Sequence, residues 1–243
     1  MGFRRALRSA FAWTNGVAAT VSFTLIGMAM AALPGGQLLQ HRFARSWGRI
    51  CIWGAGCPVR IEGLDRVDLD KRFVVMVNHQ SALDIPLLIG VMPAEWQTVF
   101  WAKQSLFQIP VLGWAMRALG HMPIDRVNRR TAGKMLLEST ERVSNQRSVL
   151  VFPEETYARE RGLLPFQRGG FLLALKTGLP ILPVGVAGTK EALPPGRHVI
   201  TPTTLTVRFG VPIPTEGLAV SSRQSLLDRT RLAIADLAGL SAS

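Results

Sequence analysis

The sequence predicts one α/β domain with a mostly buried mixed sheet flanked by helices, preceded by an N-terminal pair of helices. Short β-rich runs alternate with helical stretches from Pro58 onward, which is the pattern of an α/β fold. The β-rich runs are largely apolar, as expected for strands covered on both faces. We therefore predict membrane-associated helices over residues 1–57 and one folded domain over residues 58–243, a length sufficient for a large core.

The first predicted helix lies in an uncharged run from Phe11 to Leu33, "FAWTNGVAATVSFTLIGMAMAAL". As a helix this run would be roughly 34 Å long, enough in principle to cross the apolar core of a bilayer. Thr and Ser residues dilute its apolar character, and Pro34, Gly35 and Gly36 then break it.

The second predicted helix follows that break and is amphipathic. Its two stripes are apolar (Leu39, Phe43, Trp47, Ile50) and basic (Arg42, Arg45, Arg49). Such a helix lies in the plane of a membrane surface. Arginines flank the uncharged run on both sides, so the positive-inside rule gives no crossing direction. We expect a hairpin that dips into one leaflet. The alternative is a cleaved signal peptide, with "AMA" at 29–31 as an acceptable cleavage pattern.

The net charge of +12 is concentrated at the N-terminus, because no acidic residue precedes Glu62. Positive charge beside an apolar segment favours anionic lipid headgroups, at about 1 kcal/mol for each Lys or Arg near the surface. The basic residues do not form a nucleic-acid-binding pattern, so we expect no nucleic-acid partner. Cys51 and Cys57 are too few for a disulfide framework and lack His or Cys partners at metal spacing.

The predicted domain contains seven strands and five helices, with no internal repeat and no second domain boundary. The strands are expected at 59–63, 73–77, 98–102, 121–125, 148–152, 181–187 and 205–209. The helices are expected at 81–92, 104–119, 129–145, 169–178 and 221–239.

Polar clusters follow four of these strands: "VNHQ", "WAKQ", "IDRVNRR" and "FPEETYARERG". Sheets of this kind place ligands in the loops at the carboxyl ends of their strands. The sequence therefore predicts a site at that edge of the sheet.

His79 and Asp84 are the candidate catalytic pair. On one continuous helix, positions five residues apart are about 140° apart, so a direct contact requires the chain to turn between them. With Ser81 as the N-cap of the next helix, His79 would lie in the preceding loop and Asp84 at the third helical position, facing back. The carboxylate would then fix the imidazole tautomer and leave the second ring nitrogen as a base.

Other interpretations of this pair remain open at this point. An Asp near a helix start is commonly a cap favoured by the helix dipole, and a lone His is often structural. No Ser or Cys lies in a setting typical of a covalent nucleophile, which favours a direct base role on a substrate hydroxyl. One His and one Asp do not complete a metal site, so we expect no metal.

Four blocks occur in order between about Gly63 and Gly188. The first is N-H-x-x-x-x-D, and the others are "AKQSLFQIPVLGWAMRALGHMPIDR", "FPEETYARERGLLPFQRGG" and "ILPVGVAG". Together they resemble the glycerophospholipid acyltransferase family, in particular its bacterial 1-acyl-glycerol-3-phosphate acyltransferases. The resemblance implies a glycerolipid-acyltransferase-like domain that transfers a fatty acyl group to the free hydroxyl of 1-acyl-glycerol-3-phosphate, giving phosphatidic acid.

In such an enzyme, the resemblance implies that His79 takes the proton of the acceptor hydroxyl as it attacks the thioester of acyl-CoA or acyl-carrier protein. Asp84 would orient and charge His79. The implied substrate-binding residues are Asn78, Lys103, Arg126 and Glu154. The implied partners are membrane lipids, a lysolipid and the acyl donor, with no further cofactor. The implied location is the inner membrane, with the catalytic domain on its cytoplasmic side; the sequence does not indicate an oligomeric state.

The third block departs from the family pattern. Glu155 stands where the family has Gly, Tyr157 where it has Arg and Ala158 where it has Ser. Glu lacks the backbone freedom of Gly, and loss of the Arg removes a bidentate phosphate partner. Arg159, Arg161 or Arg168 could substitute. The alternatives are an acyltransferase for a less anionic lysolipid, such as a lyso-aminolipid, or a noncatalytic membrane lipid-binding protein.

Overall fold

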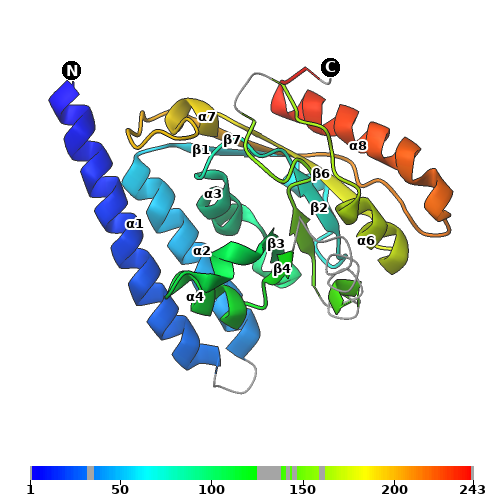
Figure 1. Cartoon of the computed structure of the whole chain (residues 1–243), viewed down its shortest axis with the longest axis horizontal. Helices are drawn as coiled ribbons and strands as arrows, with labels where there is room; N and C mark the ends of the chain where they lie inside the picture. Colours follow the sequence, from blue (N-terminus) through cyan, green and yellow to red (C-terminus); the bar gives the residue numbers. More distant parts are fainter. Residues whose placement is uncertain are drawn as a thin grey trace.

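A seven-stranded sheet forms the centre of the part of the chain that the computed structural model describes, namely residues 2–31, 36–124, 138–140, 143, 147–158 and 162–241. The strand order is β1-β7-β6-β2-β5-β3-β4 (Figure 1). The strands are β1 (Val59–Glu62), β2 (Val74–Val77), β3 (Val99–Lys103), β4 (Met122–Ile124), β5 (Val149–Val151), β6 (Ile181–Ala187) and β7 (Leu205–Phe209).

The sheet is mixed, as the sequence predicted. Strands β6 and β7 pair antiparallel, and every other neighbouring pair is parallel. Each predicted strand range overlaps one observed strand. Strand β2 is the central one and all four of its residues are buried, which explains its continuous apolar sequence.

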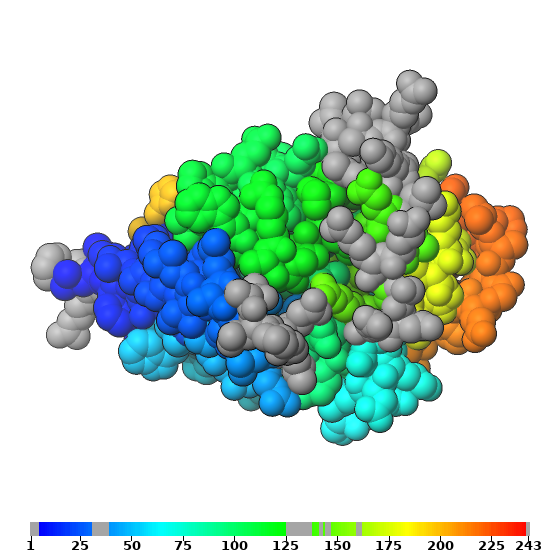
Figure 2. Space-filling view, turned by 90° about the horizontal axis from the view of Figure 1, so that it is seen from below, coloured from blue at the N-terminus to red at the C-terminus, as the bar shows by residue number. Residues whose placement is uncertain are grey.

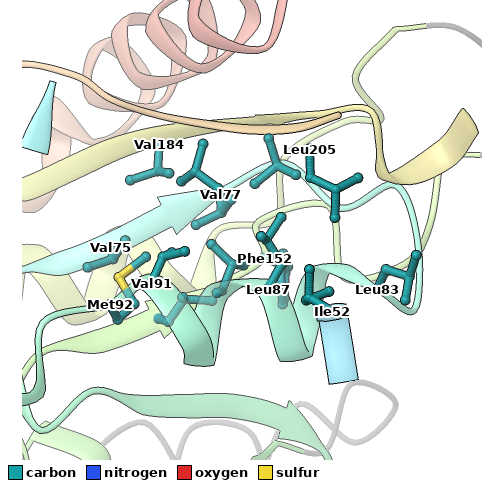
Figure 3. Close-up of a cluster of buried hydrophobic side chains, with 14 of the residues drawn as sticks. Ile52, Val75, Val77, Leu83, Leu87, Val91, Met92, Phe152, Val184 and Leu205 are labelled. Carbon is teal, nitrogen blue, oxygen red and sulfur yellow. The ribbon is translucent and has the colours of Figure 1, made fainter. Parts of the chain in front are cut away.

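Helices cover both faces of the sheet (Figure 1). On one face lie α1 (Gly2–Ala31), α2 (Gly36–Ala55), α3 (Asp84–Val91) and α4 (Leu112–Ala118). On the other lie α6 (Gly169–Thr177) and α8 (Arg223–Ala238). Val75 and Val77 of β2 pack toward α3 (Figure 3). Val74 and Met76 pack with the core of α6 and α8. This alternation along β2 divides the buried apolar residues into two cores.

Short helices connect these elements: η1 (Leu64–Arg66), η2 (Ala94–Trp96), η3 (Gln104–Gln108), α7 (Thr189–Ala192) and η4 (Val220–Ser222). The helix predicted over 104–119 is instead interrupted, with η3 and α4 on either side of Pro110. Proline has no backbone N–H to donate, and it disfavours the helical conformation of the residue before it. A continuous helix is therefore broken here. Most of the helix predicted at 129–145 lies outside the described residues.

Helices α1 and α2 lie antiparallel and in contact. The Gln40 side-chain amide donates to the Gly27 carbonyl at 2.8 Å, and the Phe23 and Phe43 rings stack at 4.2 Å. The Trp47 indole donates to the Thr20 hydroxyl at 3.1 Å. Part of the apolar stripe predicted for a membrane surface therefore packs against α1.

The outward face of α1 is apolar and exposed. Leu7, Phe11, Val17, Val21 and Leu25 lie on it. Figure 2 shows α1, in blue, at the surface beside the green segment that contains α4. No helix among the described residues combines the length and apolar character needed to cross a bilayer.

Candidate active site

The candidate site lies where β2 and β5 end. These strands are parallel neighbours, so their carboxyl ends meet at one edge of the sheet. The turn over residues 78–83 follows β2, and the segment over residues 152–158 follows β5. The two polar blocks of the sequence are thereby brought into contact.

His79 and Asp84 are hydrogen-bonded to each other across that turn. The Nδ1 atom of His79 lies 2.8 Å from Oδ2 of Asp84, and both side chains are buried. The same Oδ2 atom accepts the backbone N–H groups of Gln80 at 2.7 Å and Ser81 at 2.9 Å. Three donors thus fix the carboxylate, which leaves Nε2 as the imidazole nitrogen able to take a proton when Nδ1 carries one.

The helix after the turn begins later than predicted. Asp84 is the first residue of α3, not its third, and Ser81 is not the N-cap. The Ser81 hydroxyl instead accepts the Leu83 N–H and donates to the Leu193 carbonyl. These bonds hold residues 81–83 in a turn, a local conformation that serine hydroxyls commonly stabilise.

Asn78 holds two strands together. Its side-chain nitrogen donates to the Val186 carbonyl at 2.8 Å, and its side-chain oxygen accepts the Val186 N–H at 2.7 Å. The residue has no exposed surface. Both ends of its amide therefore bind β6, and the substrate-binding role expected for Asn78 stays a prediction.

Glu154 supports the turn over residues 78–83 from the segment after β5. One carboxylate oxygen accepts the His79 N–H and the other accepts the Leu164 N–H, each at 2.8 Å. Burial raises the pKa of the Glu154 carboxyl to about 6, although these two N–H groups favour its charged form. The sequence expectation placed Glu154 at the acceptor pocket, whereas its contacts here are with backbone.

Two aromatic rings from the same segment contact the His79 imidazole. The Phe152 ring stacks on it with centroids 3.8 Å apart, and the Tyr157 ring lies at 4.3 Å with a tilt of 52°. The Ala158 N–H also donates to the His79 carbonyl at 3.1 Å. The sequence reasoning missed these roles, although Phe152 and Tyr157 lie within the "FPEETY" block that it singled out.

The remaining expected binding residues are less closely gathered. Lys103 is the last residue of β3, beside β5 in the sheet, and it is exposed. Arg168 is exposed immediately before α6. Arg126, Arg159 and Arg161 lie outside the described residues. Within those residues, no group of three or more His, Cys, Asp or Glu side chains is arranged to hold a metal ion.

An apolar cavity of about 290 Å³ lies beside the turn over residues 78–83. Ala82 and Ile85, from the turn and the start of α3, line it together with Tyr157. Its other walls come from α1, α2, β3, η3 and α4, and include Phe23, Met28, Phe43, Ala44, Trp47, Leu106, Leu112, Ala115 and Met116. The cavity extends from Tyr157, whose ring contacts the His79 imidazole, to residues of the N-terminal helix pair.

Comparison with known proteins defines the class. A model of the Acyltransferase family matches residues 58–187, more than half of the chain, and the chain belongs to this family. The matched range contains the turn over residues 78–83 and the segment after β5.

Two named relatives share substantial sequence identity with this chain. A 1-acyl-sn-glycerol-3-phosphate acyltransferase of Saccharomyces cerevisiae is 33% identical over 219 residues, which are 89% of this chain and 69% of that protein. A chloroplastic 1-acyl-sn-glycerol-3-phosphate acyltransferase of Brassica napus is 36% identical over 161 residues, 66% of this chain and 46% of its own length. The chain thus spans about half of the Brassica protein.

A solved structure shows the same architecture. The crystal structure of the 1-acyl-sn-glycerophosphate acyltransferase of Thermotoga maritima superposes with a TM-score of 0.82 at 25% identity, covering 96% of each chain. The likeness therefore includes the N-terminal helices as well as the sheet.

Proposed function

We propose that the protein transfers a fatty acyl group from a thioester, acyl-CoA or acyl-carrier protein, to the free hydroxyl of 1-acyl-glycerol-3-phosphate, giving phosphatidic acid. The observation that carries the proposal is the hydrogen-bonded His79–Asp84 pair, whose neighbours Ala82, Ile85 and Tyr157 line an apolar cavity. A base near an apolar cavity suits an acceptor hydroxyl and a long acyl chain. The names of the relatives support the choice of acceptor.

In the proposed mechanism, Nε2 of His79 removes the proton from the acceptor hydroxyl as its oxygen attacks the thioester carbon. Asp84 stabilises the imidazolium that forms. A C–O bond forms, the C–S bond breaks, and the thiolate leaves with the proton returned by His79. A thioester is already activated, so positioning both substrates and supplying one base suffices without a covalent enzyme intermediate.

The acyl chain is assigned to the 290 Å³ cavity, whose walls are almost entirely apolar. The acceptor phosphate is assigned to the basic residues predicted from the sequence: Lys103, Arg126, Arg159 and Arg168. Guanidinium groups bind phosphate through paired hydrogen bonds, and Lys binds it as a point charge. No cofactor is required beyond the acyl donor.

The N-terminal helices would hold the enzyme at its substrates. The exposed apolar face of α1 and the nearby arginines Arg5 and Arg8 fit an anionic membrane surface. We place the protein at the inner membrane with its catalytic domain on the cytoplasmic side, where acyl thioesters are supplied.

A lysolipid panel tests the acceptor. The purified protein is mixed with vesicles containing one lysolipid at a time and with palmitoyl-CoA or palmitoyl-acyl-carrier protein, and the acylated product is quantified. We expect the highest kcat/KM with 1-acyl-glycerol-3-phosphate. Preference for an acceptor without phosphate would overturn this choice.

The second candidate is acylation of a less anionic lysolipid, such as a lyso-aminolipid. It is favoured by Tyr157 and Glu155, which replace an expected cation and add an acidic residue beside the site. The same panel separates the two acceptors. If every lysolipid stays unmodified while the vesicles still bind the protein, a noncatalytic lipid-binding role is favoured instead.

A further inference from the structure

Tyr157 lies at the junction between His79 and the apolar cavity. Its ring centroid is 4.3 Å from that of the imidazole, and Tyr157 also lines the cavity together with Ala82. The residue is 37% exposed. One residue therefore contacts both the proposed base and the space assigned to the acyl chain.

Two aromatic rings contact the imidazole. Phe152 is nearly parallel to His79, with a 17° interplanar angle and centroids 3.8 Å apart. The Tyr157 ring lies 4.3 Å from the imidazole with a tilt of 52°. These two rings, together with the Asp84 carboxylate at Nδ1, restrict rotation of the His79 side chain.

The chemistry of Tyr157 does not suit the phosphate of an acceptor. A phenol offers one O–H donor, whereas the Arg expected at this position offers a charged planar fork. Burial and the neighbouring Asp84 carboxylate both raise the pKa of the Tyr157 phenol, which keeps the group neutral. The aromatic ring of Tyr157, rather than its hydroxyl, is therefore the group that contacts His79.

We propose that Tyr157 is a positioning and donor-selecting residue, which fixes the His79 imidazole against Phe152 and forms the wall beside the first carbons of the acyl chain. The inference rests on the proposed function, because it requires a thioester carbon near Nε2 and an acyl chain in the cavity. A donor branched next to its carbonyl meets the Tyr157 ring and is disfavoured. A straight chain passes along the ring.

Kinetics of Tyr157→Leu and Tyr157→Phe test this inference on whichever lysolipid the wild type acylates. We expect Tyr157→Leu to lower kcat with palmitoyl-CoA about tenfold or more, because a misplaced base is costly. The KM for the lysolipid should stay within about twofold. Discrimination against 2-methylpalmitoyl-CoA should fall about tenfold, the size expected for one methyl group in a pocket. Tyr157→Phe keeps the ring and should restore both quantities to within about threefold.

Trp114→Leu is the matched control, because Trp114 is an exposed aromatic residue on α4 that does not line the cavity. It should change neither the kcat nor the branch discrimination. Thermal melting of all three variants checks that each is folded. Tyr157→Met replaces Tyr157→Leu if the latter melts below the assay temperature.

Two kinetic results would overturn the inference. If Tyr157→Phe loses as much activity as Tyr157→Leu, the hydroxyl rather than the ring matters. If Tyr157→Leu raises the lysolipid KM about tenfold with donor discrimination unchanged, the position selects the acceptor. Wild-type preference for a lysolipid without phosphate would overturn the proposed acceptor alone and leave the Tyr157 comparison valid.

A binding measurement tests the same wall without turnover. Titration calorimetry with the nonhydrolysable thioethers of palmitoyl-CoA and 2-methylpalmitoyl-CoA gives the ratio of their dissociation constants. The wild type should favour the straight chain about tenfold, and Tyr157→Leu should bring the ratio close to one. An identical ratio in both proteins contradicts the proposal.

Discussion

At the scale of single residues, the structure shows how closely one histidine is held. Asp84 binds the His79 ring nitrogen, Glu154 accepts its backbone N–H, and the rings of Phe152 and Tyr157 contact its imidazole. A base acts efficiently only when it is held in the productive geometry. The "FPEETY" block therefore serves the base directly, before any contact with the acceptor is considered.

Glu154 should make stability depend on pH in a defined window. Its folded-state pKa of about 6 exceeds the ordinary value of 4.5, so the folded protein binds this proton more tightly than the unfolded chain does. The resulting stabilisation is complete below about pH 4.5 and is lost as the pH rises through about 6. We expect the wild type to lose up to roughly 2 kcal/mol relative to Glu154→Gln across this window. Urea denaturation at each pH measures it, and parallel curves would refute it.

Glu155 has a backbone conformation that favours glycine, with φ of 58°. A residue with a Cβ in this region costs roughly 1–2 kcal/mol. Glu155→Gly and Glu155→Ala both remove the carboxylate, but only glycine relieves the backbone. We therefore expect the Gly variant to be more stable than the Ala variant by about 1 kcal/mol in chemical denaturation. Equal stabilities would show that the backbone is not strained.

At the scale of elements, the crossing of α2 and α3 connects the N-terminal helices to the site. A Cβ on Gly48 would lie 2.6 Å from the Gly90 nitrogen and closer still to the Pro86 carbonyl oxygen. Both neighbours are backbone atoms of α3, which begins with Asp84. Glycine at this crossing lets the helices approach closely enough to fix that end of the site.

Gly48→Ala should therefore separate the two helices. We expect a loss of about 1–3 kcal/mol of unfolding free energy, the usual cost of overpacking, together with lower activity. Gly16→Ala is the control, because a Cβ on Gly16 of α1 meets no atom within 4 Å. Alanine there should be neutral or stabilising by up to about 1 kcal/mol. Comparable losses of unfolding free energy in the two variants would show that close approach of α2 and α3 does not require glycine at position 48.

At the scale of the whole molecule, the sequence predicts the strands better than the contacts around the site. The inner strands follow from apolar β-rich runs, because burial of a central sheet leaves a local signature, whereas the edge strand β1 is largely exposed. The spacing of His79 and Asp84 permits their contact across a turn, and the resemblance to the acyltransferase family favours it. The later start of α3 does not follow from the sequence, because Ser81 makes a long-range bond to Leu193.

Two residues that were expected to bind substrate form hydrogen bonds with backbone groups that are distant in the sequence. Asn78 binds β6, more than a hundred residues away in the chain, and Glu154 binds the His79 and Leu164 backbones. The contact between Tyr157 and His79 depends in the same way on two strands that become neighbours only in the folded sheet. Local periodicity carries no information on such pairs.

We propose that His79, oriented by Asp84, is the base for acyl transfer. The most direct measurement is kcat/KM for palmitoyl transfer to the preferred lysolipid by wild type, His79→Ala and Asp84→Asn, with His198→Ala as an exposed-histidine control. We predict that both site variants lose about 10²–10⁴-fold while remaining folded, and that His198→Ala stays within about twofold. Activity of folded His79→Ala within a few fold of wild type would contradict the account.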